Sequence, residues 1–134
     1  MNKIILITGC SSGFGMLTSA RLAAAGHTIY ATMRNMQKQD TLKLELKRRN
    51  TECHILPLDV TNDNSINKVI NTIEKQDSRL DVLINNAGYG IGGFFKDLSE
   101  DEMRSQFETN FFGVQKVTRS ALPLMRYTAS KSEK

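Results

Sequence analysis

The chain has 134 residues, of which 40% are hydrophobic and 24% are charged, and this describes an ordinary globular protein of one domain. No apolar run approaches the roughly 20 residues that span a bilayer, and Met1-Asn2-Lys3 leads directly into the first apolar run, so we expect a cytoplasmic protein without signal peptide or membrane span. The net charge of +4 is modest and its basic residues are not interleaved with aromatic ones, which argues against a nucleic-acid partner.

The first unit of the chain is an apolar run, a glycine-rich turn and a helix. Ile4–Ile7 predicts a strand, the turn spans residues 8–15 (Thr-Gly-Cys-Ser-Ser-Gly-Phe-Gly), and Met16–Ala25 predicts a helix. Glycine permits a sharp turn and a close ligand, and a helix N-terminus favours an anion. We interpret this turn as the cradle of a dinucleotide pyrophosphate, although its G-x-x-x-G-x-G spacing departs from G-x-G-x-x-G. A tight turn without a ligand is the alternative.

Three further strands alternate with helices along the chain. The strands are predicted at residues 28–32, 53–58 and 80–84, with helices at 36–50 and 62–75. Leucines alternate within 36–50 as in a strand, but its Lys, Glu, Leu and Arg content favours helix. Gly26 is predicted to cap the end of the first helix, and Thr61 to cap the start of the helix at 62–75.

A long helix is predicted to follow a glycine-containing loop. Ser99 and Glu102 form a capping-box pattern, and the helix runs through Asn110 and Gly113 towards Pro123. The alternation of strands and helices predicts an α/β protein, with a parallel sheet of about four strands covered by helices on both faces. Residues 1–134 would form a single, incomplete domain of this class.

Cysteine and histidine give no sign of a metal site. Cys10 and Cys53 have neither C-x-x-C pairing nor metal-ligand spacing, which favours idle thiols in a reducing compartment. His27 and His54 each precede or begin a predicted strand without a neighbouring cluster of carboxylates or thiols, so we expect structural roles for both.

Four motifs in order resemble the short-chain dehydrogenase/reductase family. They are the turn at residues 8–15, Asp59-Val60, Asn85-Asn86-Ala87-Gly88, and Asn110 within the long helix. Tyr127 and Lys131 add the family's Y-x-x-x-K pair. The resemblance implies a Rossmann-like doubly wound sheet that binds NAD or NADP, and an enzyme that moves hydride between this cofactor and an alcohol or carbonyl substrate.

The resemblance also implies which residues meet the cofactor. The turn would hold the pyrophosphate, Asp59 would accept from the adenine amino group, and the Val60 backbone would meet the ring. A turn that starts a helix is the alternative role for Asp59, and a turn that only ties strands together is the alternative for residues 85–88. The predicted cofactor-binding residues are therefore Gly9, Ser11, Ser12, Gly13, Phe14, Gly15, Arg34, Asp59, Val60, Asn85, Ala87 and Gly88.

The end of the second predicted strand favours NADP over NAD. An NAD site would carry Asp or Glu there for the ribose 2′-hydroxyl, whereas this chain has Thr32-Met33-Arg34. Arg34 can offer a bidentate fork to a 2′-phosphate, and Ser11 can add a hydroxyl. The segment Tyr30–Arg34 is similar to the 17β-hydroxysteroid and retinol dehydrogenase-like branch of the family. A solvated surface arginine is the alternative.

Asn110, Tyr127 and Lys131 are the candidate catalytic residues. Tyr127 and Lys131 lie on one helical face at i,i+4, and a cation near a phenol favours the phenolate that a proton transfer uses. The family's Asn sits at a helix distortion and holds a water of the proton relay. A solvent-facing Asn is the alternative, since Asn is a poor helix former.

The chain also departs from the family in ways that put catalysis in doubt. The family places a fifth strand and a catalytic Ser before the Tyr, whereas only Arg126 separates Met125 from Tyr127, which suggests an internal deletion or residues omitted from the sequence. Later elements beyond Lys131 are also missing. If one helix spans Asn110 and Tyr127, they are roughly 25 Å apart at about 1.5 Å per residue, so one subunit cannot assemble the relay.

Three interpretations follow from the sequence. The first is an NADP-linked enzyme lineage acting on a small alcohol or carbonyl, impaired in this chain; the second is a non-catalytic nucleotide-binding or interaction module; the third is a truncated product without a stable fold. Homo-oligomers could form through the long helix from Ser99, or through the apolar edge that loss of the fifth strand leaves at Val82.

Overall fold

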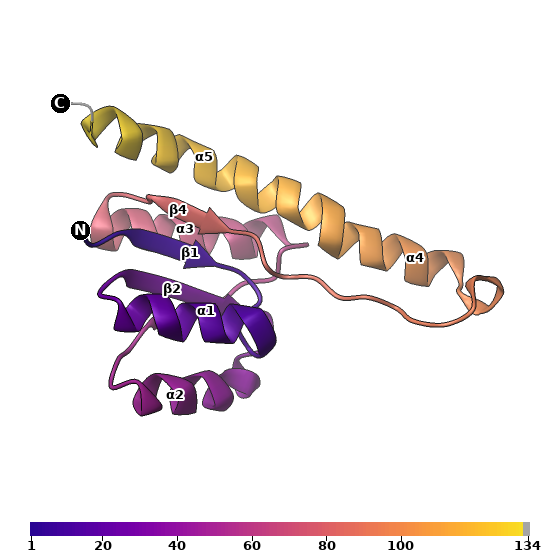
Figure 1. The fold of residues 1–134 in the computed structure, drawn as a ribbon. Coiled ribbons are helices and arrows are strands. Elements are labelled where there is room, and N and C mark those ends of the chain that lie inside the picture. Colours follow the sequence, from indigo (N-terminus) through magenta and orange to yellow (C-terminus); the bar gives the residue numbers. More distant parts are fainter. Residues whose placement is uncertain (133–134) are drawn as a thin grey trace.

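The computed structural model describes residues 1–132, which fold into a parallel four-stranded sheet with the strand order β3-β2-β1-β4 (Figure 1). The strands are β1 (Ile4–Ile7), β2 (Thr28–Met33), β3 (His54–Pro57) and β4 (Val82–Ile84). All four are the predicted strands, and β1 and β2 are buried along almost their whole length. Central strands of a parallel sheet are apolar throughout because helices cover both of their faces.

Helices alternate with these strands, and all but α4 pack on the two faces of the sheet. They are α1 (Gly13–Ala24), α2 (Gln39–Arg48), α3 (Asp63–Asp77), α4 (Glu100–Phe107) and α5 (Gly113–Ser132), with 3₁₀ turns at Met36–Lys38 and Phe95–Asp97. One buried cluster joins β1 and β2 to α1 and α2, and a second joins the other face to α3 and α5. The predicted doubly wound α/β fold is therefore confirmed, and the segment 36–50 is helical as predicted.

Three helix ends differ from the prediction. Helix α1 begins at Gly13 and not at Met16, and Ala25 caps its end while Gly26 follows with a φ of +91°. Asn62, and not Thr61, caps α3, because the Asn62 side chain accepts from Ser65 N at 2.9 Å. Both residue types can cap a helix, so the sequence alone did not discriminate between them.

The long helix starts as predicted and continues further than predicted. Ser99 and Glu102 form the reciprocal capping box at its start. A π-helical segment at Glu108–Phe112 separates α4 from α5, and Asn110 lies within this distortion. Helix α5 then continues past Pro123 to Ser132 and lies alongside β4, while the loop after β4 and α4 extend beyond the sheet (Figure 1).

Candidate dinucleotide site

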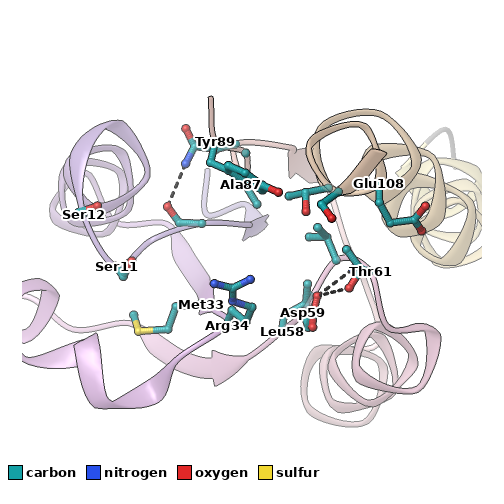
Figure 2. Close-up of a pocket in the computed structure, with 16 residues that line it drawn as sticks. Ser11, Ser12, Met33, Arg34, Leu58, Asp59, Thr61, Ala87, Tyr89 and Glu108 are labelled. Atoms are coloured by element: carbon teal, nitrogen blue, oxygen red, sulfur yellow. Dashed lines mark hydrogen bonds between the residues drawn. The ribbon is translucent and has the colours of Figure 1, made fainter. Parts of the chain in front are cut away.

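A cleft of about 670 Å³ opens at the carboxyl ends of the strands (Figure 2). The chain runs from β1 to β2 on one side, whereas β4 joins β1 on the other side. This change of direction is the position where open α/β sheets bind their ligands. The cleft is lined by eight of the predicted cofactor residues, which are Gly9, Ser11, Ser12, Arg34, Asp59, Val60, Ala87 and Gly88.

The floor of the cleft depends on two glycines that allow backbones to touch. Gly9 has a φ of +70°, and a Cβ there would lie 2.7 Å from Ala87 Cα. A Cβ on Gly15 would collide with the Gly9 carbonyl oxygen and lie 2.5 Å from Asn86 Nδ2. Gly15, Gly13 and Phe14 do not line the cleft themselves, so Gly15 supports the turn from behind.

Thr8 and Asn86 fasten the glycine turn to the loop after β4. The Thr8 hydroxyl accepts from the backbone N–H groups of Asn86 and Ala87, both at 3.0 Å. In return, Asn86 Nδ2 donates to the carbonyls of Thr8 and Gly9 at 3.1 and 3.0 Å. Thr8 is only 1% exposed, so its hydroxyl joins the glycine turn to the loop after β4 from a buried position. The sequence motifs contained both residues, but the predicted site omitted them.

The opposite wall is formed by Asp59, Val60 and Thr61. Asp59 Oδ1 accepts from Thr61 N at 2.9 Å and from Thr61 Oγ1 at 2.7 Å, which closes a local turn (Figure 2). The turn-forming role of Asp59 is thus present in the structure, on the residue that also lines the cleft.

Helix α5 supports this wall from outside. A Cβ on Gly113 would lie 2.6 Å from Val60 Cγ2, so the missing side chain lets the helix approach the wall. Lys116 Nζ donates to the Thr61 carbonyl at 3.3 Å and pairs with Glu108 at 3.4 Å. Together these contacts fix the position of the Asp59–Thr61 turn relative to the long helix.

Arg34 lies between the glycine turn and the wall formed by Asp59, Val60 and Thr61. Figure 2 shows its guanidinium between Ser11 on one side and Asp59 on the other. Arg34 follows the end of β2, and the main chain there is held by the bond from Cys10 N to the Thr32 carbonyl at 2.8 Å. The cleft therefore contains one arginine fork and the Ser11 and Ser12 hydroxyls, which suits a phosphorylated ligand.

Asn110 and Asn85 bind the protein and do not line the cleft. Asn110 Oδ1 accepts from Tyr89 N at 3.0 Å, and its Nδ2 donates to the Tyr89 carbonyl at 2.6 Å. Asn85 Nδ2 donates to Thr118 Oγ1 at 3.1 Å on α5. Both side chains fasten the loop after β4 to the long helix, and Asn110 does so from the predicted helix distortion.

Tyr127 and Lys131 lie in a different place. Tyr127 lines a groove between α3 and α5, together with Asn67, Ile70, Asn71, Glu74, Ser78, Ser120, Pro123 and Leu124. Lys131 Nζ stands 5.3 Å from the centre of the Tyr127 ring, on the same helical face as predicted. The next residue, Thr128, accepts from Leu80 N at 2.9 Å, at the start of the β4 segment, whereas the cleft opens beyond its end. The structure does not bring this pair to the cleft.

The cleft also contains residues that the motifs did not indicate. These come from the strand ends, the loop after β4 and the long helix, and they are Met33, Leu58, Thr61, Asn86, Tyr89, Ser105, Glu108 and Thr109. Asn86 stood inside a motif and Met33 inside the Tyr30–Arg34 segment, whereas Ser105, Glu108 and Thr109 line the cleft because the long helix approaches the sheet.

The cysteines are wholly or partly buried, and the histidines make contacts within the fold. Burial raises the pKa of Cys10 above its usual range, and burial together with Cys10 and Glu52 raises the pKa of Cys53 to about 12. His27 Nδ1 accepts from Lys3 N at 3.2 Å, and His54 stacks on Tyr30 with 4.6 Å between ring centres. Among residues 1–132, no three His, Cys, Asp or Glu side chains gather as a metal would require, and none of the helices described is long and apolar enough to cross a membrane.

The fold and the cleft define an α/β protein of the Rossmann-like class. The family model described as "short chain dehydrogenase" matches residues 3–133, which is nearly the whole chain. The chain therefore belongs to the short-chain dehydrogenase family, an oxidoreductase family, as its motifs predicted.

Individual relatives agree with this family membership. The chain is 41% identical over 124 residues to the 3-ketodihydrosphingosine reductase of Bacteroides thetaiotaomicron, covering 92% of this chain and 42% of the relative. It is 36% identical over 128 residues to retinol dehydrogenase 8 of Bos taurus, covering 92% and 40%. A variant of actinorhodin polyketide ketoreductase, solved with NADPH, superposes with a TM-score of 0.83 at 29% identity, covering 90% of this chain and 46% of that one. The chain thus spans less than half the length of these relatives.

Proposed function

We propose that the chain binds NADP in the cleft at the carboxyl ends of β1, β2 and β4. The observation that carries the proposal is the convergence of the Gly9 turn, Arg34, Asp59 and Ala87 on one cleft at the switch point of the sheet. The cleft is about 670 Å³, within the range of small-molecule and cofactor sites. The similar polyketide ketoreductase was solved with NADPH, and this supports a nicotinamide cofactor.

The residues present fit such a cofactor. The missing Cβ at Gly9 lets the glycine turn pack against Ala87, so both segments line one cleft and can approach the same ligand. The turn would hold the diphosphate together with Ser11 and Ser12 at the start of α1. Asp59 and Val60 would hold the adenine, and Ala87 and Gly88 would lie beside the ribose. Asn85 would act through the loop, since its amide bonds Thr118.

NADP is preferred to NAD in this proposal because of charge. Arg34 stands in the cleft where an NAD site would present a carboxylate, and Ser11 lines the same cleft. A guanidinium can form two charge-assisted bonds with a 2′-phosphate, whereas a 2′-hydroxyl offers it little.

The proposed reaction is that of the family, between NADP and a small alcohol or carbonyl. NADP supplies the hydride chemistry when bound. Tyr127 would exchange the proton of the substrate oxygen, Lys131 would favour the phenolate, and Asn110 would hold the relay. Asn110 and Tyr127 are 17 residues apart on one helical stretch, roughly 25 Å at about 1.5 Å per residue, so this chain alone does not assemble the relay. We propose an incomplete, cytoplasmic dinucleotide-binding domain of an oxidoreductase, with impaired turnover and no nucleic-acid partner.

A non-catalytic nucleotide-binding or interaction module is the second candidate. The observation that favours it is the position of Tyr127 in the groove between α3 and α5, away from the cleft. Turnover separates the two functions. The enzyme proposal expects NADPH oxidation with small ketones or aldehydes that Tyr127→Phe abolishes, whereas the module expects NADPH binding with no turnover above the protein-free rate.

Removal of Arg34 tests the choice of cofactor. We expect Arg34→Ala to weaken NADPH binding about 10- to 100-fold, because a hydrogen bond to a charged group contributes about 1.5–3 kcal/mol. NADH binding should change less than about threefold, since NADH lacks the 2′-phosphate, which corresponds to under about 1 kcal/mol. Fluorescence titration of both reduced cofactors measures this difference. Arg126→Ala, at an exposed residue of α5, is the matched control. If Arg34→Ala weakened the binding of both cofactors equally, the NADP assignment would be refuted.

A further inference from the structure

Helix α5 places one lysine against the cleft wall formed by Asp59, Val60 and Thr61. Gly113 lets the helix approach Val60, and Lys116 follows Gly113 by three residues, so both lie on the same side of the helix. Lys116 Nζ donates to the Thr61 carbonyl at 3.3 Å. The lysine side chain is 32% exposed, so this bond lies at the partly buried boundary between the helix and the wall.

The Thr61 carbonyl lies just outside helix α3. Asn62 caps this helix, and the Asn62 carbonyl accepts the helical bond from Ile66 N at 3.1 Å. Ser65 N, which is the next donor towards the start of the helix, bonds the Asn62 side chain at 2.9 Å. The donor for the Thr61 carbonyl comes instead from Lys116, so the end of the wall is bound to the long helix.

Thr61 in turn orients the Asp59 carboxylate. Asp59 Oδ1 accepts from both Thr61 N and Thr61 Oγ1, and Oδ2 takes no part in these bonds. Because Asp59 lines the cleft, an amino group of a bound ligand can donate to Oδ2. Ser65 Oγ accepts from Asp59 N at 2.9 Å and holds the start of the turn. Helix α3 thus fixes the start of the turn, and Lys116 fixes its end.

Glu108 holds the lysine ammonium from the long helix. Its carboxylate lies 3.4 Å from Lys116 Nζ, and Glu108 also lines the cleft. The two residues are eight positions apart and span the π-helical segment Glu108–Phe112, whereas pairs along a regular helix are three or four positions apart. The ammonium therefore has one partner on the long helix and one on the wall, and these two contacts fix its direction.

We propose that Lys116 is a positioning residue for adenine recognition, an inference that rests on the proposed NADP site. Lys116 is not among the residues that line the cleft, so it acts through Thr61 and not by contact with the base. It holds the Thr61 carbonyl, and Thr61 holds the Asp59 carboxylate in the direction that accepts from the adenine amino group. Without Lys116, the end of the turn rotates and this direction is lost.

The base itself distinguishes this role from general support of the fold. Unsubstituted purine has the ring of adenine without the amino group, so it deletes only the donor that Asp59 would accept from. A site built to accept a hydrogen bond binds the analogue that lacks the donor less tightly. A variant that is merely less stable binds both dinucleotides less tightly by the same factor. The ratio of the two dissociation constants therefore reports the direction of the carboxylate.

Fluorescence titration of the full chain with NADPH and with purine-NADPH, in which purine replaces adenine, tests the proposal. We expect the unaltered chain to bind NADPH about 10-fold more tightly than purine-NADPH, because the analogue leaves the carboxylate without its donor. In Lys116→Met this ratio should fall below about threefold, since the side chain keeps its length but has no donor. Lys116→Arg keeps an N–H donor and should retain the ratio.

Two further variants complete the comparison. Arg119→Met removes the same charge from an exposed residue of the same helix and should keep the ratio of the unaltered chain. Lys116→Gln, whose amide is one bond shorter and uncharged, should lose the ratio as Lys116→Met does, and it replaces that variant if methionine prevents folding. Circular dichroism shows which variants fold.

The outcomes separate this inference from the NADP proposal. If the unaltered chain does not bind NADPH, the NADP proposal is wrong and the role of Lys116 is wrong with it. If the chain binds NADPH and purine-NADPH equally, or if Lys116→Met and Lys116→Gln keep the full ratio, the role of Lys116 is refuted while the NADP site remains. Equal weakening of both dinucleotides in Lys116→Met, with the ratio unchanged, also refutes it.

Discussion

Gly9→Ala is expected to lower the free energy of unfolding by about 2–5 kcal/mol and to abolish NADPH binding. Two physical causes add at this position. Gly9 has a φ of +70°, where a residue with a Cβ is strained by about 1–2 kcal/mol. The new Cβ would also lie 2.7 Å from Ala87 Cα and 3.0 Å from Ala87 N, and these are backbone atoms that cannot rotate away. Overpacking of this kind costs about 1–3 kcal/mol.

Gly13→Ala is the matched control for Gly9→Ala. Gly13 also has a left-handed backbone, with a φ of +57°, but nothing lies within 4 Å of the position of its Cβ. Only the strain of about 1–2 kcal/mol should remain, so urea unfolding should rank Gly9→Ala clearly below Gly13→Ala. Equal stability of the two variants would contradict the close packing of the glycine turn on Ala87.

The sheet could be predicted from the sequence because its strands are short apolar runs between glycine and polar turns. Ile4–Ile7 is buried at every position, and Thr28–Met33 at all but its first. A parallel sheet with helices on both faces buries such runs completely. Helix ends were less predictable, since Thr61 and Asn62 are neighbouring residues that both suit a cap. The local turn in which the Thr61 hydroxyl donates to Asp59 decided between them.

The cleft could be predicted only where the chain itself carried a pattern. Gly9, Asp59 and Ala87 stood in motifs and line the cleft. Ser105 and Glu108 also line it, yet they lie on a helix far along the chain whose approach depends on the Gly113 contact with Val60. That contact is set by packing between elements and leaves no local pattern in the sequence.

The neighbouring residues Asn85 and Asn86 have identical side chains that bind different parts of the fold. Asn85 follows β4 and donates to Thr118 on α5, whereas Asn86 turns back to the carbonyls of Thr8 and Gly9. The motif predicted a loop beside the cofactor, but it could not show that one amide fastens the helix and the other fastens the glycine turn. The direction of each side chain follows from the path of the loop between β1 and α5.

Thr8→Val is expected to destabilise the protein by about 2–4 kcal/mol, although the two side chains have nearly the same shape. The Thr8 hydroxyl accepts from two backbone N–H groups, those of Asn86 and Ala87, at 3.0 Å each. Valine leaves both donors, on the half-buried residues Asn86 and Ala87, without their partner beside a Thr8 that is 1% exposed. An unsatisfied buried donor costs about 1–3 kcal/mol, and the side-chain bonds of Asn86 to the same turn limit the local relaxation. Urea unfolding measures the change.

Thr8→Ser separates the hydroxyl from the methyl group. Serine keeps the acceptor, so it should lose only the methyl contacts, about 1 kcal/mol, and retain NADPH binding. In Thr8→Val, amide hydrogen exchange at Asn86 and Ala87 should accelerate more than at β2, because the loop after β4 is released while the sheet persists. If Val and Ser variants were equally stable, the hydroxyl would not be what joins the glycine turn to the loop. The cleft would then depend on backbone packing at Gly9 and Gly15 alone, and NADPH affinity should be the same in both variants.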